Sequence, residues 1–296
     1  MEKVSNFLNI DEDEELNEYR RKLYNDFVSD KELLLEAHNE GFSNEEIMHN
    51  IAIFSDLKED RELNKKIKSY EDCKTYNHFY DFKIVKNNGR PEKVFFANKY
   101  YQEYLDYMGH FYYKDFSDEF NNIKWNELDN KKAKISISNA LRKKKWVYLQ
   151  GANRSGRTYL SIALTNQFIK SNPNSDVAFF DAISRFEELR KLYFTDFNDF
   201  TNLMNHLINI EFLVIDNFGS ESKDLVMRDK ILMPLLIKRG EKENITIFTS
   251  NYKIDKLTKL YELKNKDNNG NIVSEELNNL LNSKVEQIIV SSVSLY

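Results

Sequence analysis

A glycine-bounded loop constrains the fold of this sequence more than any other feature. Its eight residues are Gly151, Ala152, Asn153, Arg154, Ser155, Gly156, Arg157 and Thr158. The apolar run Trp146–Leu149 precedes the loop, and an alternating apolar segment, Tyr159–Phe168, follows it. Glycines in such a loop let backbone N–H groups turn inward as a cradle for an anion, in front of a helix N-terminus. The pattern therefore predicts a phosphate-binding loop between a strand and a helix.

One position of this loop departs from the usual pattern G-x-x-x-x-G-K-[ST], because Arg157 stands where lysine is expected. Lysine reaches phosphate as a compact point charge, whereas arginine presents a wider planar fork. Thr158 offers its hydroxyl group to Mg²⁺. We expect the loop to bind phosphate but to place it poorly for catalysis. The alternative is a strand-to-helix turn that binds no ligand.

The composition excludes several classes of protein. The chain has 296 residues, of which 41% are hydrophobic, and this is enough for a globular core. Its net charge of −5 argues against binding nucleic acid through bulk charge, so any DNA contact must be local. The acidic start, Met1–Glu15, lacks the regions of a signal peptide, and no apolar run reaches membrane-spanning length. We therefore expect a cytoplasmic protein without a membrane partner.

The single cysteine, Cys73, excludes an internal disulfide and fits a reducing compartment. His78 lies close to it in the sequence. One cysteine and one histidine do not make a four-ligand zinc site. We therefore predict no zinc in this region.

Residues 16–70 carry a strongly charged helical pattern. The apolar residues on one face of its first helix are Leu16, Tyr19, Leu23 and Phe27. Gly41 breaks the run, and Ser43 with Glu46 forms a capping box that starts a second helix. The sequence thus predicts a small helical module. Its apolar stripe is either an internal core or a docking face for a partner helix.

Two further patterns follow the helical module. Aromatic and β-branched runs within Phe79–Phe96 flank the turn Asn87–Gly89, which predicts a β-hairpin. A helix is expected over Asn126–Arg142, ending in the basic run Arg142–Lys145. That run is either a solvated helix end or a contact with nucleic acid.

The organisation of the chain changes near residue 115, where we place a boundary between an N-terminal helical and hairpin domain, 1–115, and a second domain, 116–296. In the second domain, apolar strands alternate with helical patterns. The predicted strands are Trp146–Gln150, Val177–Asp181, Glu211–Asp216, Ile245–Thr249 and Gln287–Ser292. This alternation predicts an α/β fold with a central parallel sheet covered by helices on both faces. A ligand should bind at the carboxyl ends of the strands.

Polar residues follow two of these strands. An apolar strand that ends in Asp216 has the form of the element that holds Mg²⁺ in P-loop NTPases. The next residue is Asn217, whose amide can orient water but cannot accept its proton as a carboxylate would. Glu221 in the following loop is a weaker candidate for the missing base. Asn251 is a candidate to bind the γ-phosphate or the attacking water, or else a simple turn residue.

The order of these elements resembles the AAA+ ATPases, and among them the DnaI/DnaC type of bacterial replicative helicase loader. The segments that carry the resemblance are Gly156–Leu160, Phe212–Glu221, Arg228–Asp229, Arg239 and Phe248–Tyr252. They occur in the family's order and spacing between residues 146 and 290. The N-terminal residues resemble the family's helicase-binding domain more faintly, and its zinc-binding cysteines are reduced to Cys73.

The resemblance implies an AAA+ P-loop domain that binds ATP at Gly151–Thr158 and Mg²⁺ at Thr158 and Asp216, with Asp216 and Asn251 facing the γ-phosphate. Arg239 resembles the arginine that reaches the nucleotide of a neighbouring subunit, so a homo-oligomer is implied. The alternative for Arg239 is a solvated residue at a helix end. The other partners implied are a hexameric DnaB-type replicative helicase and single-stranded DNA.

Three positions depart from the family's catalytic pattern. Arg157 replaces lysine, Asn217 replaces the second carboxylate, and Ile288 takes the place of a sensor arginine. A general base and a phosphate-stabilising charge each contribute on the order of a hundredfold to rate. We therefore expect ATP to be bound and hydrolysed weakly or not at all.

Three functions are compatible with the sequence. The first is a DnaI-like loader in the initiation or restart of DNA replication, a primosome component that uses nucleotide as a switch. The second is a non-catalytic adaptor of the replication machinery that needs no nucleotide, which the three departures favour. The third is a transposition-type AAA+ ATPase that binds DNA, against which the long acidic N-terminal module counts.

Overall fold

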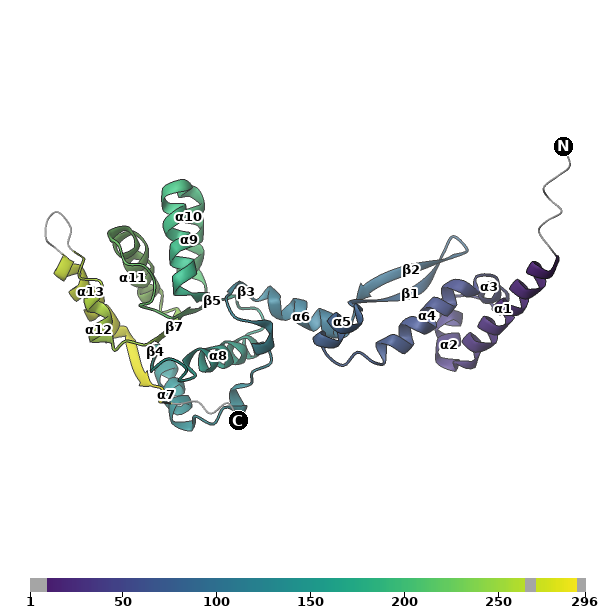
Figure 1. The fold of residues 1–296 in the computed structure, drawn as a ribbon, viewed down its shortest axis with the longest axis horizontal. Helices are drawn as coiled ribbons and strands as arrows, with labels where there is room; N and C mark the ends of the chain where they lie inside the picture. Colours follow the sequence, from purple (N-terminus) through teal and green to yellow (C-terminus); the bar gives the residue numbers. More distant parts are fainter. Residues whose placement is uncertain (1–9, 264–269, 292–296) are drawn as a thin grey trace. The chain divides into compact units, whose positions relative to one another are not determined.

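The computed structural model describes residues 10–263 and 270–291 and divides into two compact units, Met1–Asp106 and Tyr107–Tyr296 (Figure 1). The division falls earlier than residue 115, where the sequence indicated a boundary. The reason is that β3, Phe111–Lys114, pairs with a strand of the larger unit. A four-residue strand with mostly half-buried side chains gives too short a pattern to be recognised in the sequence.

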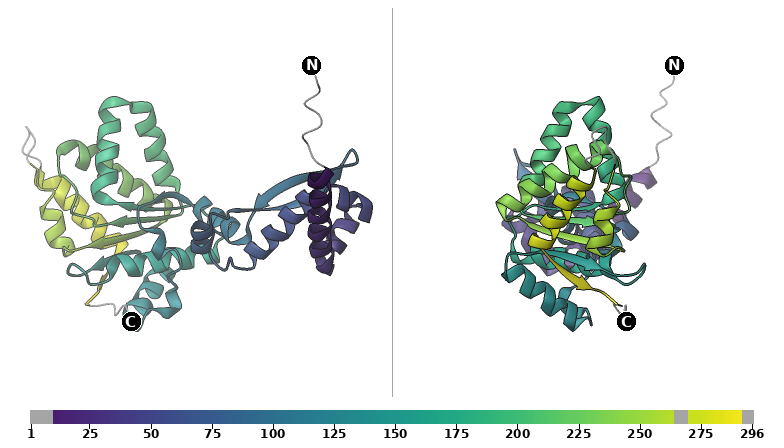
Figure 2. Two further views of the ribbon diagram at one scale, coloured as in Figure 1. Left: turned by 45° about the vertical axis from the view of Figure 1, so that its right-hand side comes forward. Right: turned by 90° about the vertical axis from the view of Figure 1, so that its left-hand side faces the viewer.

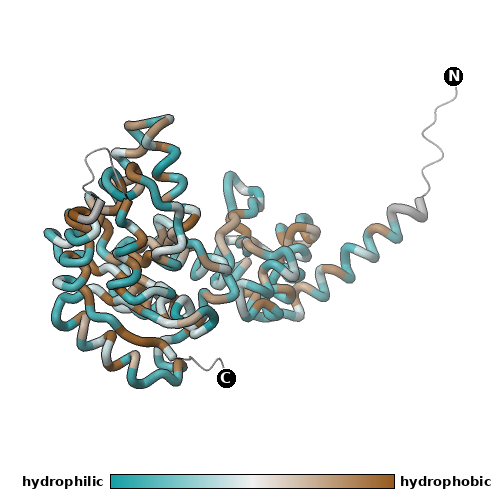
Figure 3. Tube along the Cα trace, turned by 60° about the vertical axis from the view of Figure 1, so that its left-hand side comes forward, coloured by the Kyte–Doolittle hydropathy of each residue, from teal (hydrophilic) through white to brown (hydrophobic). Residues whose placement is uncertain are grey.

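From residue 10 onward, where the structure describes it, the N-terminal unit contains five helices and the greater part of a sixth. They are α1 (Ile10–Ser29), α2 (Lys31–Asn39), α3 (Asn44–His49), α4 (Ile51–Asn64), α5 (Tyr70–Tyr76) and α6 (Lys99–Gly109). The rings of Phe27 and Phe42 pack against Phe54, with centroids 5.3 and 5.2 Å apart, at the centre of the core. Leu16 and Tyr19, expected on the same apolar face of α1 as Phe27, are 49% and 59% exposed. Figure 3 accordingly draws α1 mostly in hydrophilic colours.

The local signals of this unit are confirmed. Ser43 and Glu46 form the capping box at the start of α3, with Ser43 N–H donating to Glu46 Oε2 at 2.8 Å and Glu46 N–H to Ser43 Oγ at 3.2 Å. The hairpin consists of β1 (Tyr80–Asn87) and β2 (Arg90–Ala97), which pair antiparallel. Asn88 and Gly89 both have positive φ, at 49° and 77°, as this turn requires.

The larger unit is built on a six-stranded sheet with the order β3-β5-β6-β7-β4-β8, in which every pair is parallel. The strands after β3 are β4 (Trp146–Gln150), β5 (Val177–Asp181), β6 (Phe212–Asp216), β7 (Ile245–Ser250) and β8 (Val285–Ile289). Four of the predicted strands are confirmed to within one residue. The last, predicted at Gln287–Ser292, begins and ends earlier, at Val285–Ile289, and Ser292 lies outside the described residues. The four central strands are almost wholly buried, because helices cover both faces.

Two helical layers enclose the sheet. On one face lie α7 (Lys131–Arg142) and α8 (Arg157–Ser171), which pack on Val147, Leu149 and Val214. The helices on the other face are α9 (Ala182–Thr195), α10 (Phe197–Asn209), α11 (Met233–Lys242), α12 (Ile254–Lys259) and α13 (Gly270–Lys284). Figure 2 shows α9 and α10 as an adjacent pair of helices beside the sheet. The sheet therefore forms the middle layer of three, and its carboxyl edge is where β4 leads into α8.

Among the described helices, none combines the length and the apolar character that crossing a bilayer requires.

Candidate nucleotide-binding site

The glycine-bounded loop connects the carboxyl end of β4 to the first turn of α8, as the sequence predicted. Gly151 N–H donates to Ser250 O at 3.1 Å, which ties the start of the loop to β7. A Cβ atom at Gly151 would lie 2.4 Å from Val290 O and 2.6 Å from Ser155 Oγ, so only glycine fits there. Gly156 has a φ of 87°, which side chains disfavour. The exposed tip of the loop, residues 152–154, leaves the cradle open to a ligand.

Two buried polar atoms of the phosphate loop and the start of α8 have no hydrogen-bond partner among the described residues. Arg157 is only 6% exposed, and its Nη1 is buried without a hydrogen bond, as is Ser155 Oγ. Burial lowers the pKa of Arg157, and the attraction of Asp216 opposes this change. An unpaired buried cation is costly, and an anion that accepts its hydrogen bonds removes the cost. The residues of the loop therefore fit the phosphate groups of a nucleotide.

Asp216, at the end of β6, is 5% exposed and surrounded by hydroxyl groups. Thr158 Oγ1 lies 2.9 and 3.1 Å from its two carboxylate oxygens, and Thr249 Oγ1 donates to Oδ1 at 2.5 Å. Burial raises the pKa of Asp216, whereas these hydrogen bonds lower it. A carboxylate beside a hydroxyl group forms the all-oxygen donor set that Mg²⁺ prefers. Thr158 and Asp216 thus lie together, as a shared Mg²⁺ site would need.

Asn217 follows Asp216 with a φ of 58° and is held on both sides. Its N–H donates to Thr249 Oγ1 at 3.0 Å, and its Nδ2 donates to Asp181 Oδ1 at 2.9 Å and to Asp216 Oδ2 at 3.3 Å. The amide therefore bridges two carboxylates at neighbouring strand ends. This arrangement holds the amide in place, but it provides no group at Asn217 that accepts a proton.

The sequence did not single out Asp181 or Thr249 as parts of this site. Asp181 lies directly beside Asp216 because β5 and β6 are adjacent in register. Both residues could have been found at the ends of predicted strands, but the sequence does not state which strands are neighbours. Asn251 lies beyond the end of β7 and is exposed, so its contact with a γ-phosphate stays a prediction.

Arg239 is placed differently from the expectation of a residue that reaches a neighbouring subunit. It is 0% exposed, and burial lowers its pKa to about 9. Its guanidinium donates to the carbonyls of Leu207, Ile210 and Ile245 at 2.6, 2.8 and 2.6 Å, and to Thr246 Oγ1 at 3.0 Å. Ile245 and Thr246 lie at the amino end of β7 and Leu207 and Ile210 at the end of α10, on the opposite edge of the sheet from the phosphate loop. The structure corrects this prediction: Arg239 joins the end of α10 to the start of β7.

Two other candidate positions are also structural. Ile288 is 6% exposed and pairs in register with Leu149, so its side chain belongs to the core and not to a sensor position. Glu221 is 3% exposed, and its carboxylate accepts from Gly219 N–H at 2.8 Å and from the hydroxyl of Tyr261. Neither residue bears on hydrolysis in this arrangement. Arg157 and Asn217 remain as the two departures within the site.

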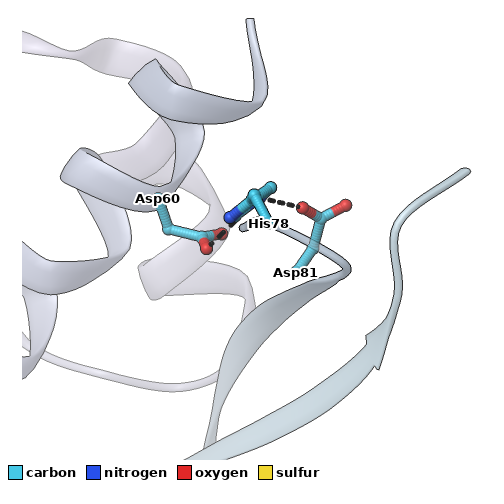
Figure 4. A group of neighbouring side chains, drawn as sticks. All are labelled: Asp60, His78 and Asp81. Atoms are coloured by element: carbon cyan, nitrogen blue, oxygen red, sulfur yellow. Dashed lines mark hydrogen bonds and ion pairs between the residues drawn. The ribbon is translucent and has the colours of Figure 1, made fainter. Parts of the chain in front are cut away.

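A second buried polar group lies in the N-terminal unit, where Asp60, His78 and Asp81 converge (Figure 4). His78 Nε2 lies 2.8 Å from Asp81 Oδ1 and 3.8 Å from Asp60 Oδ1. Asn98 Nδ2 lies 3.3 and 3.2 Å from the two oxygens of Asp81, and Arg61 Nη1 donates to Asp60 Oδ2 at 3.1 Å. Both oxygens of Asp81 and one oxygen of Asp60 thus accept hydrogen bonds from the protein itself.

Cys73 belongs to the same network. It is fully buried, and its Sγ lies 3.7 Å from Asn98 Oδ1. Burial raises the pKa of its thiol. A neutral thiol that donates to an amide is a packed, unreactive group. The network therefore connects α4, α5 and the two ends of the hairpin.

Comparisons with known proteins agree with this geometry. The family described as IstB-like ATP binding protein matches residues 98–266. A search of the curated proteins finds no match. The crystal structure of DnaI has 21% identity and a TM-score of 0.50, and the match covers 62% of this chain and 98% of that one.

Two other solved structures are similar over the same region. The DnaC helicase loader has 18% identity and a TM-score of 0.46, over 59% of this chain and 100% of that one. AMPPCP-bound DnaA from Aquifex aeolicus has 14% identity and a TM-score of 0.47, over 60% of this chain and 51% of that one. The likeness to DnaI shows that the larger unit has the AAA+ P-loop fold, which confirms the fold expected from the sequence.

Proposed function

The chain belongs to the family of IstB-like ATP binding proteins, and on that premise we propose that it is a helicase loader that uses bound ATP as a switch. In this proposal the AAA+ unit binds ATP and Mg²⁺, and the N-terminal unit binds a hexameric replicative helicase. The complex delivers the helicase to single-stranded DNA. The motif resemblance to the DnaI/DnaC loaders supports the choice of partners.

One observation carries the nucleotide-binding part of the proposal. Ser155 Oγ, in the loop, and Arg157 Nη1, in the first turn of α8, are buried without hydrogen-bond partners among the described residues. A loop retained only as a turn would gain stability by replacing the arginine with an apolar residue. A buried guanidinium nitrogen without a hydrogen bond at this position supports a bound anion.

The residues of the chain have distinct tasks in the proposed site. Arg157 and the loop N–H groups hold phosphate, while Thr158 and Asp216 hold Mg²⁺. When bound, Mg²⁺–ATP supplies a γ-phosphate whose presence distinguishes two states of the site. Asn217 orients a water molecule through its amide, and neither it nor the buried Glu221 accepts a proton from that water.

Slow hydrolysis is compatible with a switch. A ligand shifts an equilibrium between two states in proportion to its different affinities for them, and no turnover is needed for that shift. ATP binding would favour one state of the loader–helicase complex and its loss the other. We therefore propose that binding, and not rapid turnover, is the function of the site.

The test is a titration of the purified chain with ATP and ADP in the presence of Mg²⁺, followed by capture of the replicative helicase with and without nucleotide. We expect saturable ATP binding, helicase capture that depends on nucleotide, and little phosphate release. The proposal fails if neither nucleotide binds at millimolar concentration, or if the helicase is not captured under any condition.

The non-catalytic adaptor is the second candidate, because Asn217 removes the group that activates water. The double variant Arg157→Lys/Asn217→Asp separates the two functions. Recovered ATP hydrolysis would reveal an intact nucleotide pocket with altered chemistry, as the switch requires. Helicase capture that stays unchanged in the absence of any nucleotide binding would favour the adaptor.

A further inference from the structure

The segment that leads into the sheet unit is unusually basic. Residues 131–145 include seven lysine or arginine residues and no aspartate or glutamate, although the whole chain has a net charge of −5. Twelve of these residues form α7, which covers the lower end of the sheet unit in Figure 1. Ala133, Ile137 and Ala140 attach the helix to the core, so its basic residues lie on its outer sides.

Most of these cations are not neutralised by the protein. Over the described residues, Lys144 is the only member of the segment in an ion pair, with Glu243 at 2.6 Å. Lys134 Nζ donates to Leu128 O at 3.2 Å, and Lys145 Nζ donates to Ser283 O, so both contact carbonyls and not carboxylates. Surface cations usually have acids nearby, and their absence leaves a positive potential over α7.

The elements packed against α7 do not cancel this charge. The short helical turn η3, Trp125–Glu127, contributes Glu127, but that carboxylate pairs with Lys124 at 2.9 Å. The neighbouring strand β8 contributes Glu286, which is exposed and forms no ion pair within the described chain. Glu286 and the exposed Asp129, two residues before Lys131, stand beside six cations of the segment that form no ion pair over the described residues, so the surface around α7 stays positive.

A groove runs along this basic face. Its volume is about 320 Å³, and it is lined by Trp125, Lys134, Ile135, Ser138, Asn139 and Arg142. Ile135 is 62% exposed in the groove, and Lys134 Nζ lies 5.6 Å from the centre of the Trp125 ring. The groove thus combines cations, hydrogen-bonding side chains and an apolar floor, and contains no acid.

We propose that this face of α7, defined by Lys131, Lys134, Ile135 and Arg142, binds single-stranded nucleic acid. The cations bind the backbone phosphates, and the groove accepts a base against Ile135 and the edge of Trp125. Residues 131 to 142 extend over about 16 Å of helix, which is room for several successive phosphates. An acidic peptide would use the cations but would gain little from an apolar, aromatic groove, whereas an unstacked base would use both.

This inference rests on the proposed function only in taking DNA as the natural form of the nucleic acid. It adds a location for that contact, outside the nucleotide site. Lys131, Ile135 and Arg142 are exposed and Lys134 is half-buried, whereas Ala133, Ile137 and Ala140 are the residues of α7 buried in the core, so substitutions on the α7 face leave these core residues unchanged.

The first test removes three charges. The variant Lys131→Gln/Lys134→Gln/Arg142→Gln keeps good helix formers, and its matched control is Lys65→Gln/Lys66→Gln/Lys68→Gln, three exposed lysines of the N-terminal unit. Binding of a fluorescent oligothymidylate is measured by anisotropy over a range of salt concentrations. We expect the α7 variant to bind roughly tenfold more weakly or worse, with a salt slope lower by about 2, and the control to bind like the wild type.

A second variant tests the groove without changing charge. Ile135→Ser should weaken oligothymidylate binding several-fold and leave the salt slope unchanged, because it removes an apolar contact with the base. Circular dichroism should show the same helix content in all variants. Unchanged binding in Ile135→Ser would leave a charge-only surface and overturn the assignment of the groove.

Two outcomes overturn the proposal as a whole. One is a charge-reduced α7 variant that binds oligothymidylate as tightly as the wild type. The other is an oligoglutamate of equal length that binds the α7 face as tightly as the oligonucleotide, since the surface would then serve an acidic protein.

Helicase capture is measured in parallel on the same variants. If the wild type captures no helicase, the proposed function fails irrespective of the result on α7.

Discussion

The N-terminal unit and the sheet unit each bury charged side chains, but they satisfy them differently. In the N-terminal unit, the carboxylates of Asp60 and Asp81 accept hydrogen bonds from His78, Asn98 and Arg61. In the sheet unit, Arg157 Nη1 and Ser155 Oγ have no partner, although both atoms are buried. In the first group three of the four carboxylate oxygens accept hydrogen bonds within the protein, whereas the two buried atoms of the second group form none over the described residues.

The difference teaches how to tell a structural polar cluster from a binding site. Completed hydrogen bonds contribute modestly to stability, whereas an unsatisfied buried group costs free energy that a ligand can return. The histidine–aspartate group contains residue types that can bind metal, yet its oxygens are engaged by the protein. By residue type the phosphate loop is the weaker candidate for a binding site, because it lacks the usual lysine. It is nevertheless the group whose buried polar atoms still lack hydrogen-bond partners.

The largest effect is expected from Asp81→Ala, which leaves His78 and Asn98 without their shared acceptor. Breaking such a buried network costs about 2–4 kcal/mol. Urea unfolding is followed by circular dichroism and by amide hydrogen exchange in the N-terminal unit. Trp125 and Trp146 both lie in the other unit, so tryptophan fluorescence should report an unchanged sheet unit.

The matched control for that variant is Asp56→Ala, whose carboxylate is exposed and pairs with Lys93. It should change stability by less than about 1 kcal/mol. Addition of a chelator or of Zn²⁺ should leave both proteins unaffected, since the cluster is complete without metal. If the stability of the protein depended on Zn²⁺, the histidine–aspartate group would be a binding site and not a structural cluster.

The next largest effect concerns Arg157→Met, which removes the charge and keeps much of the length. Losing charge-assisted hydrogen bonds to phosphate should weaken ATP binding by roughly a hundredfold. The ligand-free variant should be as stable as the wild type or more so, because an unpaired buried cation is gone. Calorimetric titration and thermal unfolding measure the two effects.

Arg190→Met is the control, because Arg190 lies on the surface and pairs with Glu187. It should bind ATP like the wild type. If Arg157→Met instead destabilises the ligand-free protein and leaves ATP binding intact, the arginine is structural. The phosphate loop and the N-terminal cluster would then both be structural polar groups.

A smaller, pH-dependent effect is expected at Asp216, whose pKa is raised by burial. A carboxyl group with a higher pKa in the folded protein adds stability below its unfolded pKa and loses it as pH rises through the folded pKa. Ligand-free wild type should therefore lose stability relative to Asp216→Asn as pH rises through the carboxyl range. The stabilisation of the wild type by Mg²⁺–ATP should increase as pH rises, because Mg²⁺ needs the ionised carboxylate of Asp216.

Thermal unfolding across pH, with and without Mg²⁺–ATP, measures both trends. Asp255→Asn, at an exposed residue of α12, provides the control and should follow the wild type. A ligand-free wild type that gains stability relative to Asp216→Asn as pH rises would contradict the assignment of a buried, ligand-dependent carboxylate.

The smallest effect is expected from Thr249→Val, which keeps the shape of the side chain and removes its hydroxyl. Asp216 loses a donor, and the N–H of Asn217 loses its acceptor, at a cost of about 1 kcal/mol. Thr201→Val, on the exposed side of α10, should be close to neutral. Equal destabilisation by the two variants in urea unfolding would show that Thr249 has no special place in the site.

Much of the fold could be predicted because its signals are local. The capping box of Ser43 and Glu46, the hairpin turn at Gly89 and the phosphate loop each depend on a few consecutive residues. Backbone conformational preferences decide such features, so the sequence alone reveals them. The strands of the sheet unit were predicted for a similar reason, since nearly continuous apolar runs are needed where both faces are covered.

The roles of single polar residues were predicted less well. Arg239 lies in the last turn of α11 and resembles a residue that acts between subunits, yet it is fully buried among four acceptors. Ile288 occupies a strand interior, and Asp181 was not considered at all. In each case the outcome depends on which segments become neighbours, and motif spacing does not contain that information.

The sequence by itself determined that this chain has a phosphate loop in a parallel α/β unit, preceded by a helical and hairpin unit. Only the tertiary structure decided which polar atoms find partners. It supplied hydrogen-bond partners to Asp81 and Arg239 and left Arg157 Nη1 buried without one. The physical reason is that glycine turns and apolar periodicity act over a few residues, whereas the satisfaction of a buried charge depends on every segment that folds around it.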